Sequence, residues 1–212
     1  MLNLYIIILM IALIIQGNSP YVDEYKKLYS NNINILLIFS TWKGKEYLYD
    51  LSDNVIFNKI PEIRGIQNLN LQKTTSLNGL LKAKSIGIKN VIKVRDDCFI
   101  QNINKLINSI DFNYINFLFF CNYKRNNIHF KYFVDYIQCG KVDDLINVWN
   151  FNSEKNDNYA EYHLTKHIFN NIDIKKIRFI GNIITKNNEI YWKKRNIYLS
   201  TYNSHNNYKI SI

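Results

Sequence analysis

The sequence predicts an α/β protein, a three-layer sandwich in which helices cover both faces of a mostly parallel central sheet. Apolar runs of strand length alternate along the chain with amphipathic segments of helix length, a pattern typical of parallel sheets with helical crossovers. Only 7 Gly and 2 Pro occur among 212 residues, which favours compact elements with short connections. With 47% hydrophobic residues, the chain is expected to fold as one domain over residues 1–212.

The first apolar run is the N-terminal segment MLNLYIIILMIALII. It falls short of the roughly 20 residues that span a bilayer. No basic residue precedes it, and no small-residue cleavage site of a signal peptide follows it. We therefore predict a buried parallel strand from Ile8 to Ile15 that ends at Gln16-Gly17, with an N-terminal membrane anchor as the alternative.

The remaining elements follow in order, each identified from its hydrophobic pattern. The first half is expected to contain a helix at Tyr21–Ser30, a strand at Asn34–Phe39 ending in Ser40-Thr41-Trp42, a short helix at Lys45–Leu51 and a strand at Asn54–Phe57. A helix carrying Leu77, Leu80, Leu81 and Lys84 then ends at Gly87 and precedes the strand of Val91, Ile92 and Val94. The second half is expected to contain a helix at Ile103–Ile110, strands at Ile115–Cys121 and His129–Ile137, and helices at Asp143–Trp149 and Ala160–Asn170.

Three of the predicted strands end in polar residues: Gln16-Gly17, Ser40-Thr41-Trp42 and Arg95-Asp96-Asp97. Ligands of parallel α/β sheets bind outside the carboxyl ends of the strands. A cluster of amides, Asn68, Asn70 and Gln72, is expected in a loop near the acidic strand end. Carboxylates beside amides suit a divalent metal ion held against a phosphate, so the pattern indicates a nucleotide-linked substrate.

The chain is basic, with 27 Lys and Arg against 17 Asp and Glu and a net charge of +10. This charge attracts phosphates, but the basic residues are spread out and no nucleic-acid-binding motif accompanies them, so nucleic acid is not an expected partner. Cys98, Cys121 and Cys139 form neither a disulfide framework nor a zinc motif. We interpret them as small buried hydrophobes of a protein in a reducing, cytoplasmic compartment.

A series of short motifs resembles the WavE lipopolysaccharide-synthesis family, a branch of the GT-A glycosyltransferases. The motifs cover most of Ile11 to Phe169 and are IIQG, IFSTWKG, Asn-x-Asn-x-Gln with Asn78-Gly79-Leu80-x-x-Ala83, KVRDD, YFVDYIQCGKVDDL and AEYHL. The resemblance implies a GT-A-like fold, a nucleotide-sugar donor, Mn²⁺ or Mg²⁺, and transfer of a sugar to a glycan or lipid-linked acceptor. Contact with the cytoplasmic face of a membrane is a further expectation.

The expected metal ligand is Asp97, because a carboxylate at a strand's carboxyl end can bridge the ion to the donor diphosphate. Asp96 is the alternative ligand, or an acceptor for Arg95. The chain has Arg-Asp-Asp where many GT-A enzymes carry Asp-x-Asp, so Arg95 is also a candidate for pairing with phosphate directly. A surface turn with an internal Arg–Asp pair would explain the same residues without function.

The other donor-side candidates are polar groups at the ends of the predicted strands and in the amide segment. Gln16 and Gly17 are expected to let the backbone approach the nucleotide, and Ser40, Thr41 and Trp42 to hold the base and ribose. Asn68, Asn70 and Gln72 would bind sugar hydroxyls or phosphates. A core role for Trp42 and ordinary loop capping by the amides are the structural alternatives.

On the acceptor side, Glu161 is the candidate catalytic base that deprotonates the acceptor hydroxyl. Asp135, which precedes Gly140 in the motif above, is expected to bind donor-sugar hydroxyls and is the second candidate base. Glu161 could equally be a first-turn acid favoured by the helix dipole. His163 and His167 lie one turn apart without the carboxylate of a zinc motif, and His205 is a minor candidate for the metal.

Two other functions fit parts of the sequence. A non-catalytic basic α/β protein that binds nucleic acid or an anionic surface would not depend on Asp96 and Asp97. A nucleotidyltransferase of related architecture is expected to have a basic, Gly-rich loop after the first strand. The segment at that place, Gln16-Gly17-Asn18-Ser19, contains no basic residue and so does not match this expectation.

Overall fold

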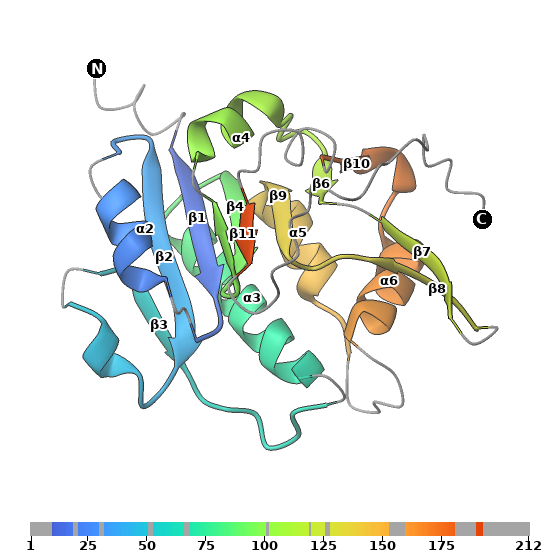
Figure 1. The fold of residues 1–212 in the computed structure, drawn as a ribbon, viewed down its shortest axis with the longest axis horizontal. Coiled ribbons are helices and arrows are strands. Elements are labelled where there is room, and N and C mark those ends of the chain that lie inside the picture. The colour runs from blue at the N-terminus through green and yellow to red at the C-terminus, as the bar shows by residue number, and fades with distance from the viewer. Residues whose placement is uncertain are drawn as a thin grey trace.

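The protein is a three-layer α/β sandwich, seen in a computed structural model (Figure 1). The structure describes residues 10–18, 21–29, 32–50, 53–65, 68–100, 102–118, 120–125, 128–152, 160–180 and 190–192. Within these ranges the central sheet has seven strands. In spatial order they are β10 (Ile177–Phe179), β6 (Ile115–Phe117), β9 (Ile137–Lys141), β4 (Asn90–Arg95), β1 (Ile11–Gln16), β2 (Ile35–Trp42) and β3 (Val55–Asn58).

The sheet is mostly parallel, as the sequence predicts. Strands β4, β1, β2 and β3 run parallel to one another, and β10 runs parallel to β6. The exception is β9, which is antiparallel to both β4 and β6. Outside this sheet, β5 (Cys98–Ile100) pairs with β11 (Ile190–Trp192), and β7 (Phe120–Arg125) forms a hairpin with β8 (Ile128–Phe133).

Two hydrophobic clusters hold the layers together. On one face, α2 (Val22–Tyr29) and α4 (Ile103–Ser109) pack against alternate residues of the sheet such as Leu13 and Ile92. On the other face, α3 (Leu69–Ser85), α5 (Val142–Trp149) and α6 (Ala160–Asn171) cover residues such as Ile14 and Val91. Because side chains of a strand alternate between the two faces, a central strand covered on both sides is expected to be apolar on both, as β1 is from Ile11 to Ile15.

The prediction of a buried N-terminal strand is confirmed for Ile11–Ile15. Every residue of β1 is buried, and the strand extends one residue farther to Gln16. Ile8 and Leu9 lie outside the described residues. None of the helices that the structure describes is long and apolar enough to cross a bilayer.

Several predicted boundaries in the first half were wrong. The helix expected at Lys45–Leu51 is a single 3-10 turn, η1 (Glu46–Leu48), which buries no residue and so lacks the packing that would extend it. The amide segment expected as a loop belongs largely to α3. Asn68 precedes its first residue with a left-handed backbone (φ 63°), and Asn70 and Gln72 lie within the first turn.

The second half contains more strands than the sequence predicts. The segments expected at Ile115–Cys121 and His129–Ile137 each divide between the central sheet and the β7–β8 hairpin. The chain leaves the sheet after β6, forms the hairpin, and returns at Ile137 as β9. The connection of residues 134–136 between β8 and β9 brings Asp135 to the edge where β4 ends.

Candidate active site

The candidate site lies at the carboxyl ends of β1, β2 and β4. The strand register places Gln16 level with Ser40 on one side and with Arg95 on the other. This confirms that the polar strand ends recognised in the sequence share one edge of the sheet. Beyond that edge, the chain turns at Gly17-Asn18 and at Asp96-Asp97.

The turn after β1 is built around the carboxylate of Asp96. The backbone N–H of Asn18 donates to Asp96 Oδ2 at 2.5 Å, and the Asp96 N–H donates to the Gln16 carbonyl at 2.9 Å. Gly17 has a φ of +114°, and a Cβ at this position would lie 2.5 Å from the Asp96 carboxyl carbon. Glycine is therefore required here both by backbone conformation and by the close approach of Asp96.

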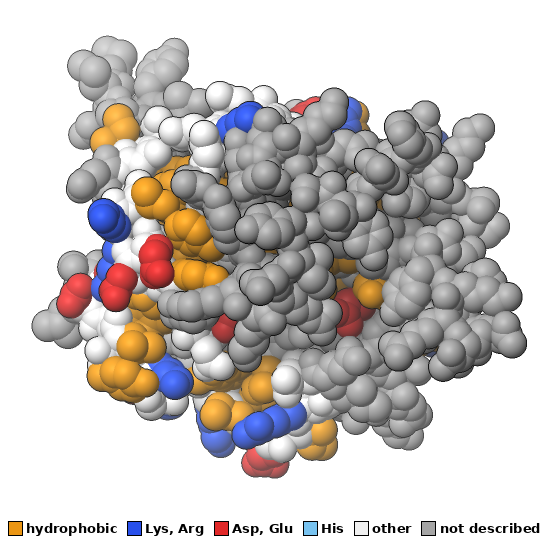
Figure 2. Space-filling view, in the orientation of Figure 1, with side chains coloured by type: hydrophobic (Ala, Val, Ile, Leu, Met, Phe, Trp, Pro, Cys, Tyr) orange, Lys and Arg blue, Asp and Glu red, His pale blue; other side chains and the backbone are white. Residues whose placement is uncertain are grey.

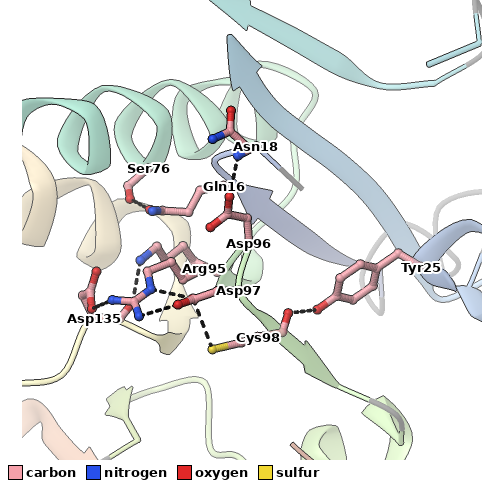
Figure 3. Close-up of polar contacts among 10 residues, drawn as sticks. Gln16, Asn18, Tyr25, Ser76, Arg95, Asp96, Asp97, Cys98 and Asp135 are labelled. Carbon is pink, nitrogen blue, oxygen red and sulfur yellow. Dashed lines mark hydrogen bonds and ion pairs between the residues drawn. The ribbon is translucent and has the colours of Figure 1, made fainter. Parts of the chain in front are cut away.

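Arg95 joins two acidic residues from distant parts of the chain (Figure 3). Its Nε and Nη2 donate to the two oxygens of Asp97, each at 2.7 Å, and its Nη1 donates to Asp135 Oδ1 at 3.0 Å. The guanidinium also lies 3.9 Å from the ring centre of Tyr136. Burial acts to raise the pKa of Asp97, but the hydrogen bonds and charge of Arg95 outweigh it and lower that pKa.

Asp135 is the most buried of these carboxylates, with a side chain only 1% exposed. Its Oδ1 accepts from Arg95, whereas its Oδ2 has no hydrogen-bond partner among the described residues. A buried carboxylate oxygen without a donor is costly. Asp135 therefore has an unused acceptor that a donor group of a ligand, such as a sugar hydroxyl, would satisfy.

Glu161 lies close enough to this cluster to interact electrostatically with it. Burial, followed by the like charge of Asp135, raises the pKa of Glu161 to about 7, and Arg95 only partly opposes this. Glu161 is the second residue of α6, as expected from the sequence. The structure thus brings together the two residues predicted as catalytic, and it adds the reason why the pKa of Glu161 lies near neutrality.

Several residues that the sequence analysis missed fix the strand ends. Ser76 of α3 donates to Gln16 Oε1. Asn58, at the end of β3, donates to the Thr41 carbonyl at 2.7 Å and to Ser40 Oγ at 3.0 Å, and it accepts from Asn78 at 2.6 Å. The available signal for Asn58 was its place after Val55-Ile56-Phe57, since it ends a strand at the same edge as Gln16 and Ser40.

Not every predicted donor-side residue is open to a ligand. Four of these residues are buried, namely Gln16, Ser40, Thr41 and Trp42. Trp42 is therefore a core residue, as in the structural alternative. The other three form a buried polar layer beneath the site. Asn70 donates to the Ile63 carbonyl at 2.8 Å, which supports the capping interpretation. It also lines an open pocket of about 520 Å³ together with Lys59, Lys73 and Asn152.

Of the two carboxylates at the end of β4, only Asp96 is placed to bind a metal ion. Both oxygens of Asp97 are bonded to Arg95, which leaves this carboxylate poorly placed to be a ligand. Asp96 points to the other side of the turn (Figure 3), toward Asn18. The described residues contain no group of three or more His, Cys, Asp or Glu side chains that could hold a metal. Mg²⁺ is commonly bound by one or two carboxylates plus substrate phosphates, and Asp96 fits that arrangement.

The histidines contribute no ligand set in the part of the chain that is described. His167 Nε2 lies 2.7 Å from the Asn147 carbonyl oxygen, a contact that ties α6 to α5, and His205 lies outside the described residues. Cys98 and Cys139 are buried and belong to no disulfide among the described residues, as predicted. The side chain of Cys121 is outside the described part of the structure.

Comparison with known proteins gives similarity of fold only. No model of a known protein family and no curated protein matches the chain. Among solved structures, a glycosyltransferase involved in glycosylation of the major capsid of PBCV-1 is 10% identical, with a TM-score of 0.47 over 81% of this chain and 83% of that one. A structure described as a glucose-1-phosphate thymidylyltransferase from Bacillus anthracis, in complex with sucrose, is 12% identical, with a TM-score of 0.40 over 80% of this chain and 85% of that one.

Proposed function

We propose that this protein is a glycosyltransferase that moves a sugar from a nucleotide-sugar donor to a hydroxyl group of a glycan or lipid-linked acceptor. The observation that carries the proposal is the convergence of Arg95, Asp135 and Glu161 at the carboxyl edge of the sheet. This edge is where α/β sheets bind nucleotides. Arg95 offers a cation for a phosphate, while Glu161 offers a carboxylate whose pKa of about 7 suits proton transfer at neutral pH.

In the proposed reaction, the acceptor oxygen forms a bond to the anomeric carbon of the donor sugar. The bond between that carbon and the diphosphate breaks, and the electron pair leaves with the nucleoside diphosphate. Glu161 takes the proton of the acceptor hydroxyl. Asp135 Oδ2 accepts a hydrogen bond from a hydroxyl of the donor sugar and holds the anomeric carbon in place. This transfer needs no oxidant and no further reactant.

Asp96 is the residue that would hold Mg²⁺ or Mn²⁺ in this site. Such an ion, when bound, stabilises the negative charge that develops on the leaving diphosphate. Gly17 contributes to the same region, because the absence of a Cβ leaves room for the Asp96 carboxylate against the backbone of the turn. Asp97 is assigned a different role, which is to orient Arg95.

The WavE-like motifs support the choice of acceptor class. On that resemblance we propose that the chain acts in lipopolysaccharide or other polysaccharide synthesis at a cytoplasmic membrane surface. The segments that follow β2 and β3 support a membrane contact, because they expose apolar side chains beside basic ones. Tyr47 is 76% exposed and Ile63 64% exposed, with Lys43, Lys59 and Arg64 on the same two segments.

The experiment that tests the function is a thermal-shift panel of nucleoside diphosphates and nucleotide sugars, each with and without Mn²⁺. A ligand at one hundred times its dissociation constant stabilises the native state by about 2.7 kcal/mol. We expect one nucleotide series to stabilise the protein, and Arg95→Met to lose the effect. Stabilisation by single-stranded nucleic acid instead, unchanged in Arg95→Met, would support the non-catalytic binding protein.

A further inference from the structure

Lys93 is a buried lysine in the middle of the central sheet. It lies on β4, between Ile14 of β1 and Gln138 of β9 in the strand register, and its side chain is fully buried. It points to the sheet face that α5 covers, since its Nζ lies 4.5 Å from the ring centre of Trp149. A charged side chain in such a place is costly unless it makes strong polar contacts.

The hydrogen bond of Lys93 is made to the backbone of Asp135. The Nζ donates to the Asp135 carbonyl oxygen at 2.6 Å. Two residues farther along the same strand and on the same face, Arg95 bonds the carboxylate of Asp135. Asp135 is thus held twice, once by its main chain and once by its side chain, and both donors come from β4.

This double contact matters because Asp135 belongs to neither neighbouring strand. Residues 134–136 connect β8 to β9, and β8 belongs to a separate hairpin. The Tyr136 carbonyl accepts from the Arg95 N–H at 2.8 Å, which anchors the far end of the connection. The Lys93 ammonium anchors its centre, at the residue whose carboxylate faces the site.

We infer that Lys93 is a positioning residue for Asp135: by holding the Asp135 carbonyl, it keeps that carboxylate bonded to Arg95 and close to Glu161. The role of Asp135 rests on the proposed function, but the placement of Asp135 by Lys93 does not. Without the ammonium, the centre of the connection loses its anchor and can shift between its two held ends, so that Asp135 and Glu161 no longer repel each other as strongly.

The ionisation of Glu161 reports this placement, because the carboxylate of Asp135 helps to raise its pKa while Arg95 opposes it. The protein is labelled with ¹³C at the Glu carboxyl carbons, and the signal of Glu161 is assigned by its loss in Glu161→Gln. Its titration is then followed by NMR in the wild type, in Lys93→Met and in Ile92→Met. Ile92 is the matched control, because it is equally buried on the same strand but faces the opposite cluster. Asp135→Asn shows the effect of removing the Asp135 charge outright.

We expect Lys93→Met to shift the Glu161 titration to lower pH, in the direction of Asp135→Asn, and Ile92→Met to leave it unchanged. A shift to higher pH would mean that Lys93 acts only through its charge, and no shift would mean that it only fills space. Either result overturns the inference. If Lys93→Met does not fold, Lys93→Leu, which also has no hydrogen-bond donor, serves the same test with the same expected direction. The measurement requires neither donor nor acceptor, so its failure is distinguishable from failure of the proposed transfer.

Discussion

Arg95 and Asp97 form a bidentate ion pair across a single turn, with two hydrogen bonds of 2.7 Å. The Arg95 side chain is only 17% exposed, so the pair is largely shielded from water. Because Asp97 occupies two of the guanidinium nitrogens, the third is directed to Asp135. The carboxylate expected to bind a metal therefore fixes the orientation of the neighbouring cation, and the metal proposal moves to Asp96.

Replacing Asp96 or Asp97 should have different effects on ligand binding. Asp96→Ala should abolish the Mn²⁺-dependent part of stabilisation by a nucleoside diphosphate, since it removes the proposed ligand. Asp97→Ala should keep the metal dependence but weaken binding in the absence of metal, because Arg95 loses its orientation. Thermal shifts with and without Mn²⁺ measure both. Metal dependence that is lost in Asp97→Ala and kept in Asp96→Ala would restore Asp97 as the ligand.

Glu161→Gln should reduce transfer while leaving donor binding intact. General base catalysis contributes roughly 10²–10⁴ to rate, and the amide keeps the shape of the side chain without accepting the proton. Donor binding is followed by thermal shift, and transfer by release of the nucleoside diphosphate. Glu46→Gln on the exposed turn η1 is the control. Transfer at a near-normal rate in Glu161→Gln would point to Asp135 as the base.

The ionisation of Glu161 should also make stability depend on pH. Its pKa is about 7 in the folded protein against an ordinary value of 4.5. Between these values the native state binds more protons than the unfolded state, so stability falls as pH rises from 4.5 to 7, by up to about 3 kcal/mol. Urea unfolding across this range should show a shallower fall in Glu161→Gln than in the wild type. Parallel curves would mean that Glu161 ionises normally.

At alkaline pH, the ionisation of Lys93 should change the stability in the opposite direction. Burial lowers its pKa to about 8, partly offset by Asp135, against an ordinary value of 10.5. At Lys93 the unfolded state therefore binds more protons between pH 8 and 10.5, so this lysine should contribute a rise in stability of about 3 kcal/mol over this range. Burial raises the pKa of the Cys139 thiol above its ordinary value of 9.0, which opposes the rise in the wild type and in Lys93→Met alike. The stability of the wild type relative to Lys93→Met should therefore increase with pH. The comparison is best made below pH 10, because Tyr29 and Tyr136, whose pKa values are raised to about 12, lower the stability of both proteins above it.

The segments after β2 and β3 should contact anionic membranes. Hydrophobic and basic side chains are interspersed along the lower edge of the face in Figure 2, below β3. Ile60→Ser with Ile63→Ser should reduce sedimentation with phosphatidylcholine vesicles that contain phosphatidylglycerol, because apolar contacts supplement attraction by lysines. Ile33→Ser with Ile86→Ser changes exposed isoleucines at the opposite edge of the sheet and serves as the control. An equal loss of sedimentation in the two double variants would mean that the segments after β2 and β3 are not a specific membrane-binding surface.

The sequence determined the elements whose signal is local. The apolar runs of β1 and β2, and that of β4 apart from Lys93, predict buried parallel strands, and their polar ends predict the shared edge where Gln16, Ser40 and Arg95 lie. The start of α6 at Ala160, and with it the place of Glu161 in the first turn, also follows from the sequence pattern. These features depend on the order of apolar and polar residues within a few positions.

Only the tertiary structure decided which of these residues meet. Arg95 and Asp135 are 40 positions apart, and they come together because β9 is inserted antiparallel beside β4. The periodicity of a strand indicates that it is buried but does not specify its neighbour or direction. The same insertion gives Lys93 a carbonyl to bind, and it adds the charge of Asp135 to the burial that raises the pKa of Glu161. A buried lysine that binds a carbonyl 42 positions away is a property of that packing, which no local pattern of residues encodes.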